Sequence, residues 1–152
     1  MTYNHIQHGR WHYILLVFAL ATVAGAWLAR SQPPLVPILM AIAAVFAFCG
    51  LIFGSLAISD EGDRLALHFG PLPLLFKRVR YADITAVEID RTSVIDGWGI
   101  HYIPGRGWTY NLWGFDCVKL MLGRKIIRVG TDDAENLAKF LRERTGLSGH
   151  AE

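Results

Sequence analysis

The sequence predicts a hairpin of two membrane-spanning α-helices followed by a mainly β domain that ends in one helix. All 13 acidic residues and all but two of the 15 basic residues follow residue 59, so charge divides the chain into two unlike parts. The first part consists almost entirely of two long uncharged runs. The second part shows short alternating runs between turn residues and then one helical pattern. With 152 residues, the chain has room for a single β domain beside the hairpin.

The first uncharged run, residues 11–29, has 19 residues and would reach about 28 Å as a helix, close to the thickness of the hydrocarbon layer. The second run, residues 31–59, is longer than one span needs. Pro33 and Pro34 indicate a loop over residues 30–35, and Pro37 fits a first helical turn, so we expect the second span over residues 36–56. Two alternatives stay open: a buried helical hairpin of a soluble protein, and a signal peptide cleaved near residues 24–26.

Small residues recur at helical spacing in both runs, which predicts that the two helices pack against each other in lipid. They are Ala19, Thr22, Val23 and Ala26 in the first run, and Ala41, Ala44, Ala47 and Gly50 in the second. Neither span contains a charged residue, which argues against an ion pathway or a transporter. Arg10 and Arg64 flank the spans on one side and Arg30 lies in the loop, a bias that favours both termini in the cytoplasm. We expect residues 1–10 to be a flexible segment before the first span.

The pattern of residues 57–146 predicts the β domain, with about seven antiparallel strands in a partly open barrel or sandwich. Alternation places Leu65 and Leu67 on one strand face and predicts that Val87 and Ile89 point inward. The strongest hairpin signal joins two alternating runs over residues 118–129, with Gly123-Arg124 as the turn.

A helix is expected over residues 131–145, after which residues 147–152 form a tail. Thr131 is the candidate N-cap, and Gly146 fits the C-cap. Apolar residues in this segment form one stripe, as expected for a helix that covers one face or one end of the β domain.

Several segments resemble bacterial pleckstrin-homology-like domains, which often follow a pair of transmembrane helices. They are residues 56–59, 67–71 and 81–84, and further similarity to small membrane proteins of this type covers 97–102, 110–111 and 129–132. The resemblance spans about residues 36–145. It implies a seven-stranded, partly open barrel capped by a helix, in a protein of the bacterial inner membrane. It implies no catalytic activity and transfers no ligand residues to this chain.

Aromatic residues and glycines are concentrated between residues 97 and 113. Exposed aromatic side chains between flexible turns predict a surface for a partner or for the membrane interface. The alternative is that these rings fill the core of a small domain. The candidate interaction patch consists of Trp98, Tyr102, Trp108, Tyr110 and Trp113.

Basic residues form two clusters in the β domain, and the second contains no acidic residue between positions 118 and 130. On a domain tethered to a bilayer, each such residue near anionic lipid contributes about 1 kcal/mol. The alternative is an ordinary solvated face. The candidate lipid-facing residues are Lys77, Arg78, Arg80, Lys119, Arg124, Lys125 and Arg128.

No pattern in the sequence predicts catalysis, a cofactor or a metal site. His5, His8 and His12 would share one side of a helix, but no Cys or carboxylate lies nearby to complete a metal site. The acid or base candidates among the strands, namely His68, Asp96, His101 and Asp116, form no nucleophile–base pair by spacing. Cys117 is expected to point out of its strand, and two cysteines exclude a disulfide framework.

These observations lead to two functional hypotheses. The first is a non-enzymatic membrane protein whose cytoplasmic β domain binds another membrane or membrane-associated protein. The second is a sensor of anionic phospholipid headgroups that uses the basic clusters. A formal charge of +2 does not indicate a nucleic-acid partner.

Overall fold

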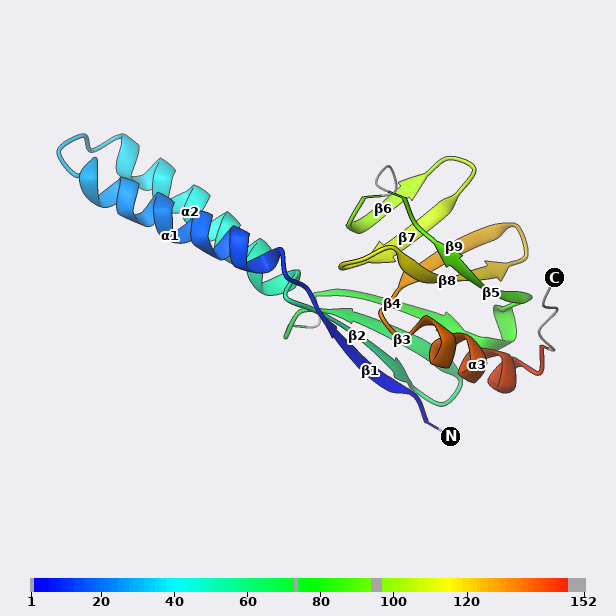
Figure 1. The fold of residues 1–152 in the computed structure, drawn as a ribbon. Coiled ribbons are helices and arrows are strands. Elements are labelled where there is room, and N and C mark those ends of the chain that lie inside the picture. The colour runs from blue at the N-terminus through cyan, green and yellow to red at the C-terminus, as the bar shows by residue number, and fades with distance from the viewer. Residues whose placement is uncertain (1, 73, 94–96, 148–152) are drawn as a thin grey trace.

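The computed structural model describes residues 2–72, 74–93 and 97–147. A helical hairpin extends away from a β domain, and the two parts meet at one end of each (Figure 1). The hairpin consists of α1 (His12–Leu28) and α2 (Leu35–Ile52). Among the described residues, α2 alone is long and apolar enough to cross a membrane, since α1 is apolar but has 17 residues. The second helix ends four residues before the predicted boundary at 56, because Leu56 already belongs to a strand.

The hairpin buries small side chains and exposes large ones. Ala19, Ala26, Ala43 and Gly50 are buried between the helices, whereas large residues such as Phe18 and Val45 are mostly exposed. A Cβ atom at Gly50 would lie 2.9 Å from Cδ2 of Leu16, so glycine permits the closest approach of the two helices. Three of the small residues named from the sequence, Ala19, Ala26 and Gly50, therefore lie at the helix contact, while Ala41 and Ala44 are exposed.

The β domain consists of two sheets that pack face to face. The first sheet has the order β1-β2-β3-β4, and the second has the order β5-β8-β9-β7-β6. The first comprises β1 (Asn4–His8), β2 (Ser55–Asp60), β3 (Arg64–Phe69) and β4 (Leu75–Arg80). The second comprises β5 (Ala86–Arg91), β6 (Gly99–Ile103), β7 (Gly107–Asn111), β8 (Asp116–Leu122) and β9 (Lys125–Gly130).

The described strands number nine, not seven, and one pairing differs from the predicted antiparallel pattern. Strands β7 and β9 are parallel, with Trp108 opposite Ile127. Local patterns cannot predict this pairing, because β8 and its connections separate the two strands in the chain. The hairpin predicted over residues 118–129 is confirmed, with Val118 opposite Val129 and Leu120 opposite Ile127.

The N-terminal residues are an integral part of the fold, so the expectation of a flexible segment over residues 1–10 is wrong. Strand β1 pairs with β2 along its whole length, from Asn4 opposite Ser59 to His8 opposite Ser55. Helices α1 and α2 are thus inserted between two paired strands. Because β1 is a strand, His5 and His8 fall on opposite faces. The three histidines therefore do not share one side of a helix.

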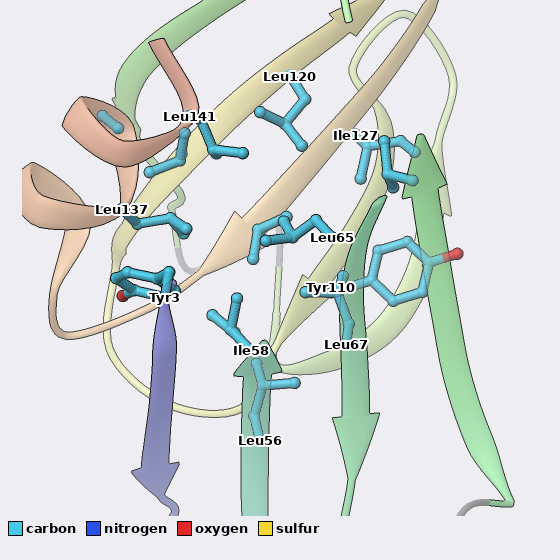
Figure 2. Packing of buried hydrophobic residues seen from close by; sticks show 14 of the residues in the cluster. Tyr3, Leu56, Ile58, Leu65, Leu67, Tyr110, Leu120, Ile127, Leu137 and Leu141 are labelled. Atoms are coloured by element: carbon cyan, nitrogen blue, oxygen red, sulfur yellow. The ribbon is translucent and has the colours of Figure 1, made fainter. Parts of the chain in front are cut away.

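Side chains from both sheets and from α3 (Ala134–Thr145) form one core. Leu137 and Leu141 of α3 point toward Leu65 and Leu120 of the two sheets (Figure 2). The predicted C-cap is confirmed, because Gly146 follows the helix with φ 69°. The helix begins three residues later than predicted, since the Thr131 hydroxyl accepts the Asp133 N–H and stabilises a turn there.

Two strand residues differ from their predicted orientation. Ile89 is half-exposed, because β5 is an edge strand and only Val87 of the predicted pair is covered. Cys117 is fully buried rather than outward-facing, since it lies on β8 between β5 and β9.

We predict that removing the Tyr3 side chain destabilises the domain. Tyr3 is 9% exposed, stacks on Phe140 at 5.4 Å between ring centroids, and donates a hydrogen bond from its hydroxyl to Asp133. Tyr3→Ala should lower the free energy of unfolding by about 3 kcal/mol, and Tyr3→Phe by about 1 kcal/mol. Thermal unfolding of the full chain measures both changes.

Ile6→Ala is the matched control, because Ile6 lies on β1 only three residues after Tyr3 but is half-exposed. It should change stability by less than about 0.5 kcal/mol. Equal effects of Tyr3→Ala and Ile6→Ala would contradict a structural role for the Tyr3 side chain.

Candidate binding site

The predicted basic residues separate into two groups once their partners are known. Four of them form ion pairs within the domain: Arg78 with Glu61, Arg80 with Asp83, Lys119 with Glu88, and Arg128 with Asp90. Within the described part of the chain, Lys77, Arg124 and Lys125 form no such pair. The three unpaired cations line the same pocket.

Arg128 has a structural role, and the expectation that it faces lipid is wrong. Its guanidinium is buried, with Nε 2.9 Å from Oδ2 of Asp90 on β5, and it also donates to the Arg106 carbonyl. Although burial acts to raise it, the pKa of Asp90 lies below its usual value because the Arg91 N–H and the Arg128 guanidinium stabilise the carboxylate. The pair thus ties β5 and β9 to the β6–β7 turn.

The pocket has a volume of about 400 Å³ and lies between β4, the β6–β7 turn and the β8–β9 turn. Among the described residues, its walls contain the three cations, two aromatic rings, glycines and two isoleucines, and no carboxylate: Lys77, Tyr102, Gly105, Gly107, Trp108, Arg124, Lys125, Ile126 and Ile127. Tyr102 and Trp108 are 57% and 45% exposed, and their ring centroids are 5.6 Å apart. Three positive charges without a counter-charge attract an anion, and the rings offer it an apolar surface.

Gly107 positions one wall of the pocket. Its φ of +87° belongs to the left-handed region, and a Cβ atom there would overlap the backbone of Ile126. Glycine therefore lets β7 approach β9 closely, which brings the β6–β7 turn over the β8–β9 turn. Trp108 follows immediately and is held beside Lys125 and Ile127 by the parallel pairing.

Two other members of the predicted aromatic patch belong to a different cluster, at the base of the hairpin. The Trp98 and Trp113 rings stack at 5.8 Å, and both contact Trp11 at the start of α1, at 5.3 and 5.7 Å. The Trp98 indole N–H donates to the Gly114 carbonyl, and the buried Gln7 amide donates to the Trp113 carbonyl. These bonds fix the turn that carries Trp113 against both β1 and the hairpin.

Tyr110, the fifth member of the patch, is a core residue. It is 8% exposed and belongs to the buried cluster between the sheets, at the side of Leu67 and Ile127 (Figure 2). Burial raises the pKa of its hydroxyl. Core filling, the alternative reading of the aromatic segment, therefore holds for Tyr110 but not for Tyr102 and Trp108.

The acid and base candidates do not assemble into a catalytic group within the described residues. His68 stacks on Phe76 and lies 4.0 Å from Glu61, while Asp116 pairs with Arg91. His101 lies on β6, a different sheet from His68, and Asp96 lies outside the described residues. His5 bonds to Asp132 rather than to another histidine.

Sequence reasoning missed the exposed leucines of the turn between β3 and β4. Leu72 and Leu74 are 51% and 55% exposed. The sequence contains a signal for them, because leucines in a proline-rich turn between two strands are expected to lie on the surface and not in the core.

No protein-family model, curated protein or solved structure matches this chain.

We predict that Gly107→Ala destabilises the chain more than Gly105→Ala does. Both glycines have positive φ, but a Cβ atom at Gly105 meets nothing within 4 Å. Alanine at either site should cost about 1 kcal/mol from backbone strain, and the overlap at Gly107 should add about 1–3 kcal/mol. Thermal unfolding of the full chain measures the difference, and equal costs would contradict the close approach of β7 and β9.

Proposed function

We propose that this chain is a non-enzymatic membrane protein whose β domain, of the pleckstrin-homology-like kind, docks an anionic segment of a partner protein. The carrying observation is the basic pocket, where the three candidate cations that have no carboxylate partner among the described residues meet two exposed aromatic rings. An acidic peptide with an apolar or aromatic residue matches this lining in both charge and surface. Two sheets closed by a C-terminal helix are compatible with the pleckstrin-homology-like proposal.

Membrane anchoring is supported by the inverted burial pattern of the hairpin. A soluble hairpin buries its large side chains, whereas this one exposes them and buries alanine and glycine. At about 1.5 Å per residue, α1 and α2 measure about 26 and 27 Å, near the thickness of a hydrocarbon layer. We therefore propose that both helices span the inner membrane and that the termini and the β domain lie in the cytoplasm.

The height of the pocket favours a protein ligand over an ordinary lipid headgroup. Lys77 lies opposite Leu67, which lies opposite Ile58, so the three residues form one row across the first sheet. Ile58 is three residues after Ser55, where β2 begins beside the hairpin. At about 3.3 Å per residue, that row is about 10 Å past the start of β2. The headgroup layer on one side of a bilayer is about 5–7 Å thick, so the pocket would open above it.

The topology proposal predicts that the loop and the domain lie on opposite sides of the membrane. In spheroplasts that express the full chain, a membrane-impermeant maleimide should label Ser31→Cys in the loop but not Glu143→Cys on α3. After lysis both should be labelled. The parent chain measures the background labelling of Cys49 and Cys117. Labelling of both introduced cysteines in intact spheroplasts, or of Glu143→Cys alone, would contradict the proposed orientation.

The docking proposal predicts cross-links from the pocket to a protein. Benzoylphenylalanine in place of Tyr102, irradiated in native membranes, should form protein adducts. Lys125→Glu should reduce their yield about tenfold, as expected for a loss of about 1.4 kcal/mol. Lys139→Glu on α3 makes the same change in net charge away from the pocket and should leave the yield unchanged.

Adducts with phospholipid alone would replace the protein-docking proposal by headgroup sensing. Equal loss of protein adducts in Lys125→Glu and Lys139→Glu would show that the net charge of the chain, and not the pocket, controls binding.

A further inference from the structure

The end of the β domain beside the hairpin carries exposed apolar residues on both sides of the hairpin base. We infer that these residues, which we call the membrane-facing rim, seat the β domain on the lipid surface. The rim consists of Trp11, Leu72, Leu74 and Trp98, which are 43–55% exposed. The inference goes beyond ligand docking, and it rests on the proposed insertion of the hairpin.

Contacts in the fold place each part of the rim next to the hairpin. A Cβ atom at Gly70 would lie 2.8 Å from the Cα atom of Ile52, so the turn that carries Leu72 and Leu74 begins against the last turn of α2. On the other side, Trp98 contacts Trp11 at the start of α1. The ribbon agrees, since the turns after β3 and β7 both lie at the hairpin end of the β domain (Figure 1).

The rim has the composition of a membrane interface. Residues 70–76, 97–99 and 111–115 carry no charged side chain, and two tryptophans lie where the hairpin enters the domain. Tryptophan is enriched at this depth of membrane proteins because its ring is apolar and its N–H is polar. A pocket of about 150 Å³ beside the rim is lined mainly by apolar residues of both parts, among them Leu15, Phe53 and Leu112.

A lipid surface fits the rim better than a single partner helix does. Leu72 and Leu74 lie beside the end of α2, and Trp98 lies beside the start of α1. One helix of a partner would reach one side of the hairpin, whereas the bilayer around the hairpin reaches both. If the hairpin spans the membrane, the rim residues lie at the level where α2 ends and can enter the interfacial layer.

Photo-crosslinking of the full chain in phosphatidylcholine nanodiscs tests the inference. Benzoylphenylalanine at position 74 or 98 should give at least fivefold more lipid adduct than at position 143 on α3, as measured by mass spectrometry of the intact chain. Positions 74 and 98 are half-exposed, so the substitution needs no repacking of the core. Thermal unfolding of each variant verifies that the fold is kept.

Position 45 separates failure of the rim from failure of the anchor. Val45 is exposed on the middle of α2 and should give lipid adducts whenever the hairpin is inserted. Adducts at 45 with yields at 74 and 98 no higher than at 143 would overturn the rim while leaving the anchor intact. Background yield at all four positions would overturn the anchor, and the rim with it.

Discussion

The antiparallel pairing of β1 with β2 is the constraint on which the rest of the structure depends. It fastens both ends of the helical hairpin to one sheet, and the Gly9 N–H continues the ladder by donating to the Gly54 carbonyl at 3.1 Å. A domain tethered by one chain can rotate about its linker, whereas two paired chains resist both rotation and bending. The hairpin therefore has a defined direction relative to the two sheets.

Internal ion pairs determine which charges remain available for binding. Arg78, Arg80 and Lys119 each bond a carboxylate on the domain surface, and such exposed pairs contribute little to stability because solvent screens them. The pairs have a larger effect on binding specificity, because the carboxylate partner weakens the electrostatic attraction between the cation and an anionic ligand. Sequence clusters of basic residues overstate the binding surface for this reason, and the ion pairs reduce seven candidates to the three that share a pocket.

Local sequence patterns predict much of the fold, but they do not predict the pairings between segments that lie far apart in the chain. The β8–β9 hairpin, the apolar helices and α3 with its Gly146 cap depend on neighbours within a few residues. Strand β1 was missed because its buried position is Gln7 and its partner lies about 50 residues away. The sequence indicates Tyr102, Trp108 and all three cations separately. It does not predict the pocket that they share, because the walls of the pocket meet through the parallel β7–β9 pairing.

The same sheet that would fix the domain to the membrane also sets the distance from which it can bind. Strand β2 begins where α2 ends, so in the proposed orientation each residue along it would raise the attached row by about 3.3 Å above the lipid. A rim seated at the interface would prevent the domain from tilting toward the bilayer, and the basic pocket would then stay above the headgroups and open sideways. Under these constraints the best-placed ligand would be an acidic segment of a neighbouring membrane protein, emerging a few residues beyond its own last apolar turn.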